Sequence, residues 1–200
     1  MAAIYFHIPF CKQACHYCNF HFSTSQKYRS ELLSAMKKEL ALRYVELPKT
    51  PLQSIYFGGG TPSLLSAQEI DELLKETKRF FTWSDTIEIT LEMNPDDHRE
   101  DYLAHLKAIG VNRLSLGIQS FYDEELTQMN RAHNAQEAYW VMDEVKQHFS
   151  NFSMDLIYSV PNSTLSSWQR NLEIALSFSP PHRSSYALTV EPQTVLHKQV

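Results

Sequence analysis

The sequence predicts an α/β fold in which a parallel sheet curves into a (β/α)6 partial barrel or forms an open doubly wound sheet. Six strand-like stretches alternate with helix-like stretches along the 200 residues, which is the order that parallel α/β folds require. Hydrophobic residues make up 43% of the chain, enough to fill a sizeable core. Because the sequence shows no linker, low-complexity tract or basic block, residues 1–200 are expected to form one domain.

The first two units each combine a short apolar strand with an amphipathic helix. Residues 3–8 are rich in aromatic and branched side chains, and residues 26–44 carry apolar side chains at helical spacing with charges between them. A second strand at residues 52–60 ends in three glycines. It precedes a helix at residues 67–81, for which Ser66 is a suitable N-cap.

The later units repeat this order. A third strand at residues 86–95 leads to a helix at residues 99–110, which Gly110 closes at a C-cap position. The remaining strands are expected at residues 112–120, 151–161 and 183–192, and the remaining helices at residues 123–130, 135–149 and 165–178. No capping signal follows the sixth strand, so no terminal helix is expected.

Composition and charge exclude two classes of function. The 18 Lys plus Arg residues are outnumbered by 23 Asp plus Glu residues, so the net charge is -5 and nothing predicts binding to nucleic acid. No apolar run approaches the roughly 20 residues that a membrane-spanning helix needs, and no secretory signal precedes the first strand. A cytoplasmic protein without an integral membrane segment is therefore expected.

All three cysteines of the chain lie within eight positions, directly after the first strand. Cys11, Cys15 and Cys18 follow the segment IYFHIPF. In a reducing cytoplasm, clustered cysteines usually serve metal or redox chemistry rather than a disulfide. One alternative is a structural zinc site, completed by a nearby histidine such as His16 or His21.

Glycine or polar residues stand on the other strands as well. The second strand ends in the GGGTP segment, the third ends at Glu92 and Asn94, the fourth ends at Gln119, and the fifth contains Asp155. Parallel α/β folds bind their ligands at the carboxyl ends of the strands. These residues and the cysteine loop are therefore predicted to form one composite site.

The cysteine motif resembles that of the radical S-adenosylmethionine (SAM) enzymes. The pattern Cys-x3-Cys-x2-Cys, with Tyr17 before the last cysteine, is followed in order by GGGTPSLL, EMNPDD, RLSLGIQSF, NRAHN, MDLIYSVP and LTVEPQT. This set is similar to the branch that contains coproporphyrinogen dehydrogenases and HemW-type heme chaperones. The resemblance implies a parallel (β/α)6 partial barrel of the radical SAM type. It also implies a 4Fe-4S cluster on Cys11, Cys15 and Cys18, with SAM at the iron that three thiolates leave open.

The same resemblance implies roles for residues around the cluster. Gly59, Gly60 and Thr61 would contact the methionine part of SAM. The other implied contacts are Glu92 with the methionine ammonium, Arg131 with its carboxylate, Gln119 and Asp155 with the ribose hydroxyls, Tyr5 near the cluster and methionine, and Tyr17 and Phe20 beside the cluster. No further catalytic residue is assigned.

Two features distinguish the members of this branch. Coproporphyrinogen dehydrogenases carry a further cysteine two residues after the third, where this chain has Phe20. They also have a longer N-terminal arm than the ten residues that precede Cys11. Both features favour a heme chaperone, which binds heme and inserts it into acceptor hemoproteins. The alternatives are oxygen-independent oxidation of coproporphyrinogen III to protoporphyrinogen IX, and non-catalytic heme transfer with a structural cluster.

Further expectations depend on the same resemblance. The partners would be heme or a related tetrapyrrole, an acceptor hemoprotein, an electron donor for the cluster and, in a homodimer, a second copy. The fifth strand of the family usually runs into a Tyr-Gly-Leu-Pro-Gly-type turn, whereas residues 158–162 read YSVPN, so a less close backbone approach is expected there. Because family members continue past the sixth strand, the chain is interpreted as truncated at its C-terminal end.

Overall fold

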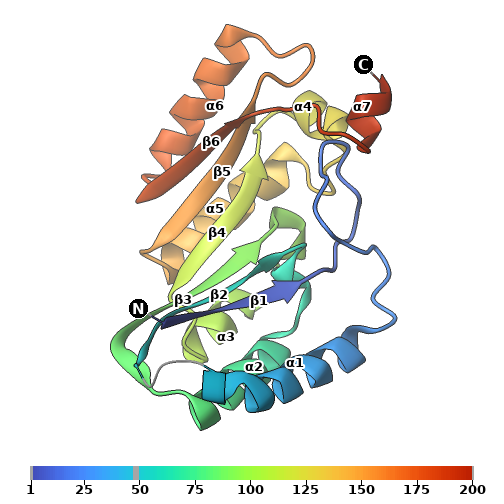
Figure 1. Ribbon diagram of the computed structural model, residues 1–200. Helices are drawn as coiled ribbons and strands as arrows, with labels where there is room; N and C mark the ends of the chain where they lie inside the picture. Colours follow the sequence, from blue (N-terminus) through green and yellow to red (C-terminus); the bar gives the residue numbers. More distant parts are fainter. Residues whose placement is uncertain (1, 47–49, 200) are drawn as a thin grey trace.

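The computed structural model describes residues 2–46 and 50–199 (Figure 1). Within these residues, six strands form one fully parallel sheet in the order β1-β2-β3-β4-β5-β6. The strands are β1 (Ala2–Ile8), β2 (Leu52–Gly59), β3 (Trp83–Met93), β4 (Arg113–Gln119), β5 (Phe152–Tyr158) and β6 (His182–Ala187). Because each strand is added next to its predecessor, every crossover runs in the same direction. The partial-barrel prediction is therefore confirmed, and the doubly wound order does not apply.

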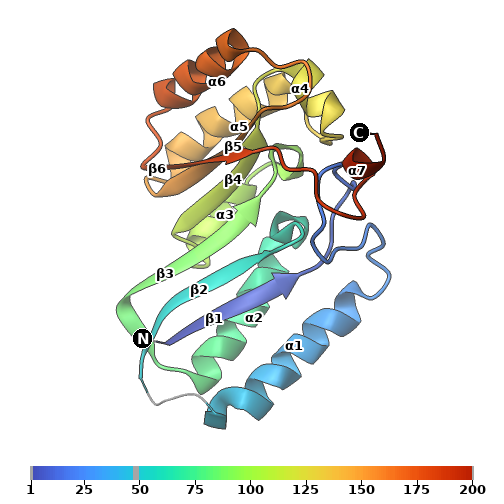
Figure 2. The ribbon, with the colours of Figure 1, turned by 45° about the horizontal axis from the view of Figure 1, so that its top comes forward.

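Helices lie between successive strands in the chain, and a last helix follows β6. They are α1 (Arg29–Arg43), α2 (Ala67–Phe80), α3 (Tyr102–Ala108), α4 (Asp123–Gln128), α5 (Ala135–His148), α6 (Leu165–Ser177) and α7 (Val195–Gln199). Figures 1 and 2 show α1, α2, α3, α5 and α6 on the same side of the sheet. Among the helices of the described ranges, none combines the length and the apolar character that crossing a bilayer demands.

Local sequence signals account for where some of the helices begin and end. Ser66 begins α2 with a capping box: its hydroxyl accepts from the Glu69 N–H at 3.2 Å, and the Glu69 carboxylate accepts from the Ser66 N–H at 2.7 Å. After α3, Gly110 adopts a φ of 104°, a conformation that glycine tolerates best. Both predicted cap positions are confirmed. The start of α3 differs, because Asp101 adopts a left-handed φ of 57° and delays the helix to Tyr102.

The chain contains a short helix, α7, that the sequence analysis did not expect. The Thr194 hydroxyl accepts a hydrogen bond from the His197 N–H at 3.1 Å, which is an N-cap contact. Leu196 is buried, and its N–H donates to the His16 carbonyl at 2.8 Å. Figures 1 and 2 accordingly show α7 beside the loop that follows β1. The prediction of no terminal helix was wrong. The helix is too short to show a periodic pattern in the sequence, and tertiary contacts hold it in place.

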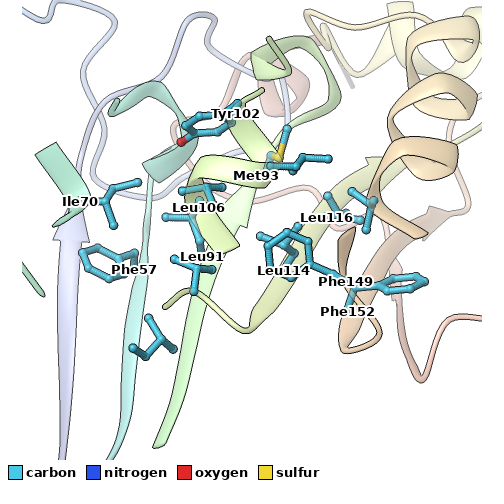
Figure 3. Packing of buried hydrophobic residues seen from close by; sticks show 14 of the residues in the cluster. Phe57, Ile70, Leu91, Met93, Tyr102, Leu106, Leu114, Leu116, Phe149 and Phe152 are labelled. Carbon is cyan, nitrogen blue, oxygen red and sulfur yellow. The ribbon is translucent and has the colours of Figure 1, made fainter. Parts of the chain in front are cut away.

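The core lies between the sheet and the helices that cover it (Figure 3). Phe57, Leu91 and Leu114 point from the interior strands β2, β3 and β4 toward helical residues such as Ile70 and Leu106. All five side chains are fully buried. Burying a side chain of this size stabilises a fold by about 1.5–3 kcal/mol. The core therefore fixes the strands whose carboxyl ends carry the polar residues.

Candidate functional site

The loop between β1 and α1 carries the three cysteines. Backbone hydrogen bonds shape it, from the Cys11 N–H to the Ser23 carbonyl at 3.0 Å and from the Cys18 N–H to the Cys15 carbonyl at 3.2 Å. All three thiols are free and partly buried. Burial raises the pKa of the Cys11 and Cys18 thiols, so a positively charged centre is needed to hold them as thiolates.

The cysteine loop rests on the segment that follows α4. The ring Nδ1 of His16 lies 3.1 Å from the Gln128 carbonyl oxygen. Asn130, in a left-handed conformation with a φ of 53°, donates from Nδ2 to the Ala14 carbonyl at 2.7 Å. The NRAHN segment thus supports the loop, and this contact places Arg131 next to the cysteines.

The GGGTP segment brings the end of β2 against the same loop. Gly59 adopts a φ of 113°, and a Cβ atom there would lie 2.7 Å from His7 Nδ1. A Cβ atom on Gly60 would lie 2.7 Å from the Phe10 carbonyl oxygen and 3.0 Å from Cys11 Sγ. A side chain at either position would therefore displace its neighbours, which explains why glycine is needed here.

Glu92 brings a partly buried carboxylate from β3. Its Oε1 accepts a hydrogen bond from the Tyr56 hydroxyl at 2.8 Å, and its Oε2 accepts one from the Gly59 N–H at 3.2 Å. Burial raises the pKa of the Glu92 carboxyl; the two donors oppose this rise, and the nearby Asp155 carboxylate adds to it. A carboxylate in this environment is stabilised when a positively charged ligand group binds beside it.

Arg131 brings a positive charge to the same site. Its Nη2 donates to Asn94 Oδ1 at 2.6 Å and to the Gly117 carbonyl at 3.0 Å, and its Nη1 lies 3.4 Å from both Cys15 Sγ and the Tyr17 hydroxyl. None of these partners is a carboxylate. The buried Nε has no partner among the described residues. The guanidinium is therefore suited to an anionic ligand group.

Gln119 and Asp155 come from the neighbouring strands β4 and β5. Gln119 ends β4 with a φ of 65°, and its side chain is buried. Burial raises the pKa of the Asp155 carboxyl, and a hydrogen bond from Ser184 opposes this rise. Both residues line the same cavity as the cysteines, which is the juxtaposition that the strand-end argument predicts.

These elements surround a cavity of about 510 Å³ at the carboxyl ends of the strands, within the range of about 300–1,000 Å³ that is usual for cofactor sites. Phe20 has 69% of its surface exposed. The predicted site residues that the structure places on the wall of this cavity are Cys11, Cys15, Cys18, Tyr17, Phe20, Gly59, Gly60, Thr61, Glu92, Gln119, Arg131 and Asp155.

Tyr5 is the predicted site residue that the structure does not bring to this wall. Its ring stacks on Tyr56, with the ring centroids 5.9 Å apart, and 56% of its surface is exposed. It lines a separate cavity together with Met36 and Leu40 of α1. Tyr5 stands three residues before the end of β1 at Ile8, and its ring lies near Glu92, because a Cβ atom on Gly58 would lie 3.0 Å from both the Tyr5 ring and Glu92 Oε1. A role for Tyr5 near the cluster stays a prediction.

Three contributors to the site were missed or given no role in the sequence analysis. Asn94 was placed at a strand end without a function, and Tyr56 and Gly117 were not singled out. A Cβ atom on Gly117 would lie 2.9 Å from Asn94 Oδ1. Gly117 carried a usable signal, because glycine within an apolar strand often marks a close approach of other groups. The Tyr56 contact with Glu92 is tertiary and left no signal in the sequence.

The zinc alternative gains no support from the geometry. Within residues 2–46 and 50–199, no three His, Cys, Asp or Glu side chains converge as a single metal ion requires. The His16 ring is hydrogen-bonded to the Gln128 carbonyl. The His21 ring faces the His7 ring, with centroids 6.3 Å apart. Both histidines considered as a fourth ligand therefore have other neighbours.

Comparison with known proteins identifies the family. The sequence model of the radical SAM superfamily matches residues 5–175. The chain belongs to the radical SAM superfamily. Within it, the chain is similar to the heme chaperone HemW of Haemophilus influenzae, at 40% identity over 96% of this chain and 52% of the relative. The heme chaperone HemW of Bacillus subtilis is 37% identical over 98% of this chain and 53% of the relative.

A solved radical SAM structure supports the same assignment. Coproporphyrinogen III oxidase (HemN) from Escherichia coli, described as a radical SAM enzyme, superposes with a TM-score of 0.89 at 28% identity, covering 98% of this chain and 46% of that chain. Membership of the radical SAM superfamily implies a 4Fe-4S cluster and SAM. The chain spans about half the length of the curated relatives it matches. The predicted membership of the radical SAM superfamily is confirmed, and the similarity to HemW and HemN agrees with the predicted branch.

Proposed function

We propose that this radical SAM chain holds a 4Fe-4S cluster on Cys11, Cys15 and Cys18, and that the full-length protein is a heme chaperone. The observation that carries the proposal is that three free thiols line one cavity together with Glu92 and Arg131. The chaperone activity is supported by relatives named heme chaperone HemW that are 35–40% identical to this chain. Residues 1–200 then form the radical SAM core domain.

The cavity residues fit the two cofactors. Three thiolates leave one iron of a cubane cluster without a protein ligand, and the bound cluster supplies a one-electron reductant at that iron. Cys15 Sγ lies 3.4 Å from Arg131 Nη1, so this sulfur has a hydrogen-bond donor beside it. The hydrogen-bond partners of Arg131 Nη2 are neutral oxygens, so the guanidinium charge can pair with the SAM carboxylate, and the Glu92 carboxylate can bind the SAM ammonium.

The remaining cavity residues bind the rest of SAM. Gly59 and Gly60 carry no side chain that would keep the methionine part away from the end of β2, and Thr61 follows them on the same wall. Gln119 and Asp155, on the neighbouring strands β4 and β5, would hold the ribose hydroxyls. A carboxylate and an amide both accept hydrogen bonds from hydroxyl groups.

Exposed aromatic rings on the cavity wall support binding of heme. Phe20 and Tyr186 are 69% and 56% exposed, and both line the cavity. Flat apolar rings of this kind pack against a tetrapyrrole. The proposed partners are an acceptor hemoprotein that receives the heme and an electron donor that reduces the cluster. The proposed form of the protein is a cytoplasmic homodimer.

A second candidate function is oxygen-independent oxidation of coproporphyrinogen III. The TM-score of 0.89 with coproporphyrinogen III oxidase (HemN) from Escherichia coli favours it. Phe20 argues against it, because the dehydrogenases that this chain resembles carry a cysteine there. A phenylalanine ring offers neither a thiol nor a hydrogen bond to the reacting tetrapyrrole.

One experiment separates the two functions. Anaerobically reconstituted full-length protein is incubated with reductant, SAM and coproporphyrinogen III, and the products are separated by chromatography. In parallel, the same preparation is titrated with heme and tested for heme transfer to an apo-cytochrome. Heme uptake and transfer without formation of protoporphyrinogen IX is the expected result. Multiple turnovers of the porphyrinogen without heme uptake would replace the chaperone with the oxidase.

A further inference from the structure

Each cysteine sulfur of the cavity has a hydrogen-bond donor next to it. The Thr61 hydroxyl lies 3.5 Å from Cys11 Sγ. Arg131 Nη1 lies 3.4 Å from Cys15 Sγ. A backbone hydrogen bond from Phe20 reaches Cys18. Two of these three donors are side chains from segments far from the cysteine loop in the sequence.

The Asn94 side chain joins the two side-chain donors. Its Nδ2 donates to Thr61 Oγ1 at 3.2 Å, and its Oδ1 accepts from Arg131 Nη2 at 2.6 Å. Because the Thr61 oxygen accepts from Asn94, the hydroxyl proton is left to point toward Cys11 Sγ. The contact at Nη2 turns the planar guanidinium so that its other arm, Nη1, faces Cys15.

The orientation of the Asn94 amide is determined by its neighbours. Arg131 can donate but cannot accept, so the amide oxygen must face it and the amide nitrogen must face Thr61. The Asn94 backbone is held by its N–H, which donates to Ser63 Oγ at 3.3 Å. Gly117 leaves room for the amide, because a Cβ atom there would lie 2.9 Å from Asn94 Oδ1.

We propose that Asn94 is a positioning residue that aims the Thr61 hydroxyl and the Arg131 guanidinium at two cluster ligands and so raises the reduction potential of the cluster. The inference rests on the proposed 4Fe-4S cluster. Hydrogen bonds to ligating sulfurs stabilise the additional negative charge of the reduced cluster, which makes its reduction easier. Arg131 thus has a second role besides binding a carboxylate, and Thr61 acts on the Cys11 sulfur through its hydroxyl.

The test is the midpoint potential of the cluster in the full-length protein, reconstituted anaerobically and titrated with dithionite under EPR without SAM. Thr61→Val removes the donor and keeps the shape of the side chain. Its midpoint potential should fall by an amount that corresponds to about a tenfold change in the reduction equilibrium, about 59 mV for one electron. Thr61→Ser keeps the hydroxyl, and its midpoint potential should equal that of the unaltered protein.

The matched control is Thr189→Val. Thr189 lines the same cavity, but its hydroxyl bonds to Glu191 Oε1 at 3.1 Å rather than to a cysteine sulfur. This variant should leave the potential unchanged. If the midpoint potential falls equally in Thr189→Val and Thr61→Val, the cause is a general loss of polarity in the cavity and the proposal is overturned.

Asn94→Ala tests the positioning role itself. It should lower the potential in the same direction as Thr61→Val. The midpoint potential of the double variant should fall by less than the sum of the two single changes, because Asn94 acts partly through Thr61. If variants that hold a full cluster show an unchanged midpoint potential, or changes that add strictly in the double variant, the proposed role of Asn94 is wrong and the proposed function stands. Failure of the unaltered protein to assemble a cluster would instead overturn the proposed function, and this inference with it.

Discussion

Replacing Glu92 with glutamine separates a binding role from a structural one. Glu92→Gln keeps the shape of the side chain but removes the negative charge. Its amide oxygen can accept from the Gly59 N–H and its amide nitrogen can donate to the Tyr56 hydroxyl oxygen, so both present neighbours keep a partner. A hydrogen bond to a charged group contributes about 1.5–3 kcal/mol. The affinity for SAM should therefore fall by about tenfold to a hundredfold.

The stability of the fold should not fall together with this affinity. Burial raises the pKa of the Glu92 carboxyl in the folded chain. A group whose pKa is raised on folding contributes its full stability below the unfolded pKa and loses it as the pH rises through the folded pKa. Ionised Glu92 therefore costs stability near neutral pH, and Glu92→Gln should leave the free energy of unfolding unchanged or raise it there.

The assay combines two measurements on full-length protein. Calorimetric titration of the reconstituted protein with SAM gives the affinity, and urea unfolding at neutral and acidic pH gives the stability. Glu88→Gln is the control, because Glu88 lies on the same strand with an exposed side chain. An unchanged SAM affinity in Glu92→Gln would refute the ammonium contact. Affinity and stability lost together would show that Glu92 acts through the fold.

Three further substitutions test other parts of the molecule. Cys11→Ala should reduce the iron content of the reconstituted protein from about four per chain to near zero; iron and sulfide analysis that still finds a full cluster would exclude Cys11 as a ligand. Gly60→Ala should impair cluster assembly with unchanged far-UV circular dichroism, since its Cβ would lie 2.7 Å from the Phe10 carbonyl oxygen; a normal cluster would show that the loop adapts. Ser66→Ala should lower the free energy of unfolding by about 0.5–2 kcal/mol, measured in urea, and a change in SAM affinity would contradict its purely local role.

The elements of the fold could be predicted where their signal is local. Strands β1 to β5 carry branched or aromatic residues, and the capping residue Ser66 indicates where α2 begins. The helix α7 could not be predicted in this way. It is five residues long, and it is held by the buried Leu196 and by the hydrogen bond to the His16 carbonyl. Contacts between segments that are 180 residues apart leave no periodic pattern.

The candidate site also has residues that the sequence predicts and residues that it does not. The positions of Glu92, Gln119 and Asp155 follow from the rule that parallel strands present their carboxyl ends at one edge, and the structure places them on one cavity. The function of Asn94 does not follow from that rule, because it depends on which atoms of Thr61 and Arg131 face the amide. Hydrogen-bond direction of this kind is a property of the folded chain.

Glu92 and Arg131, two of the charged residues that line the cavity, indicate the kind of ligand that it binds. The hydrogen-bond partners of Glu92 are the Tyr56 hydroxyl and the Gly59 N–H, and those of Arg131 include the Asn94 amide and the Gly117 carbonyl. Each charge is thus oriented by neutral groups and remains available to a ligand. A ligand that carries both an ammonium and a carboxylate, as the methionine part of SAM does, offsets the cost of burying both charges at once. Such a ligand should stabilise the folded chain by about 2.7 kcal/mol at a hundredfold excess over its Kd, whereas a nucleoside that lacks the amino acid group should stabilise it far less at the same concentration.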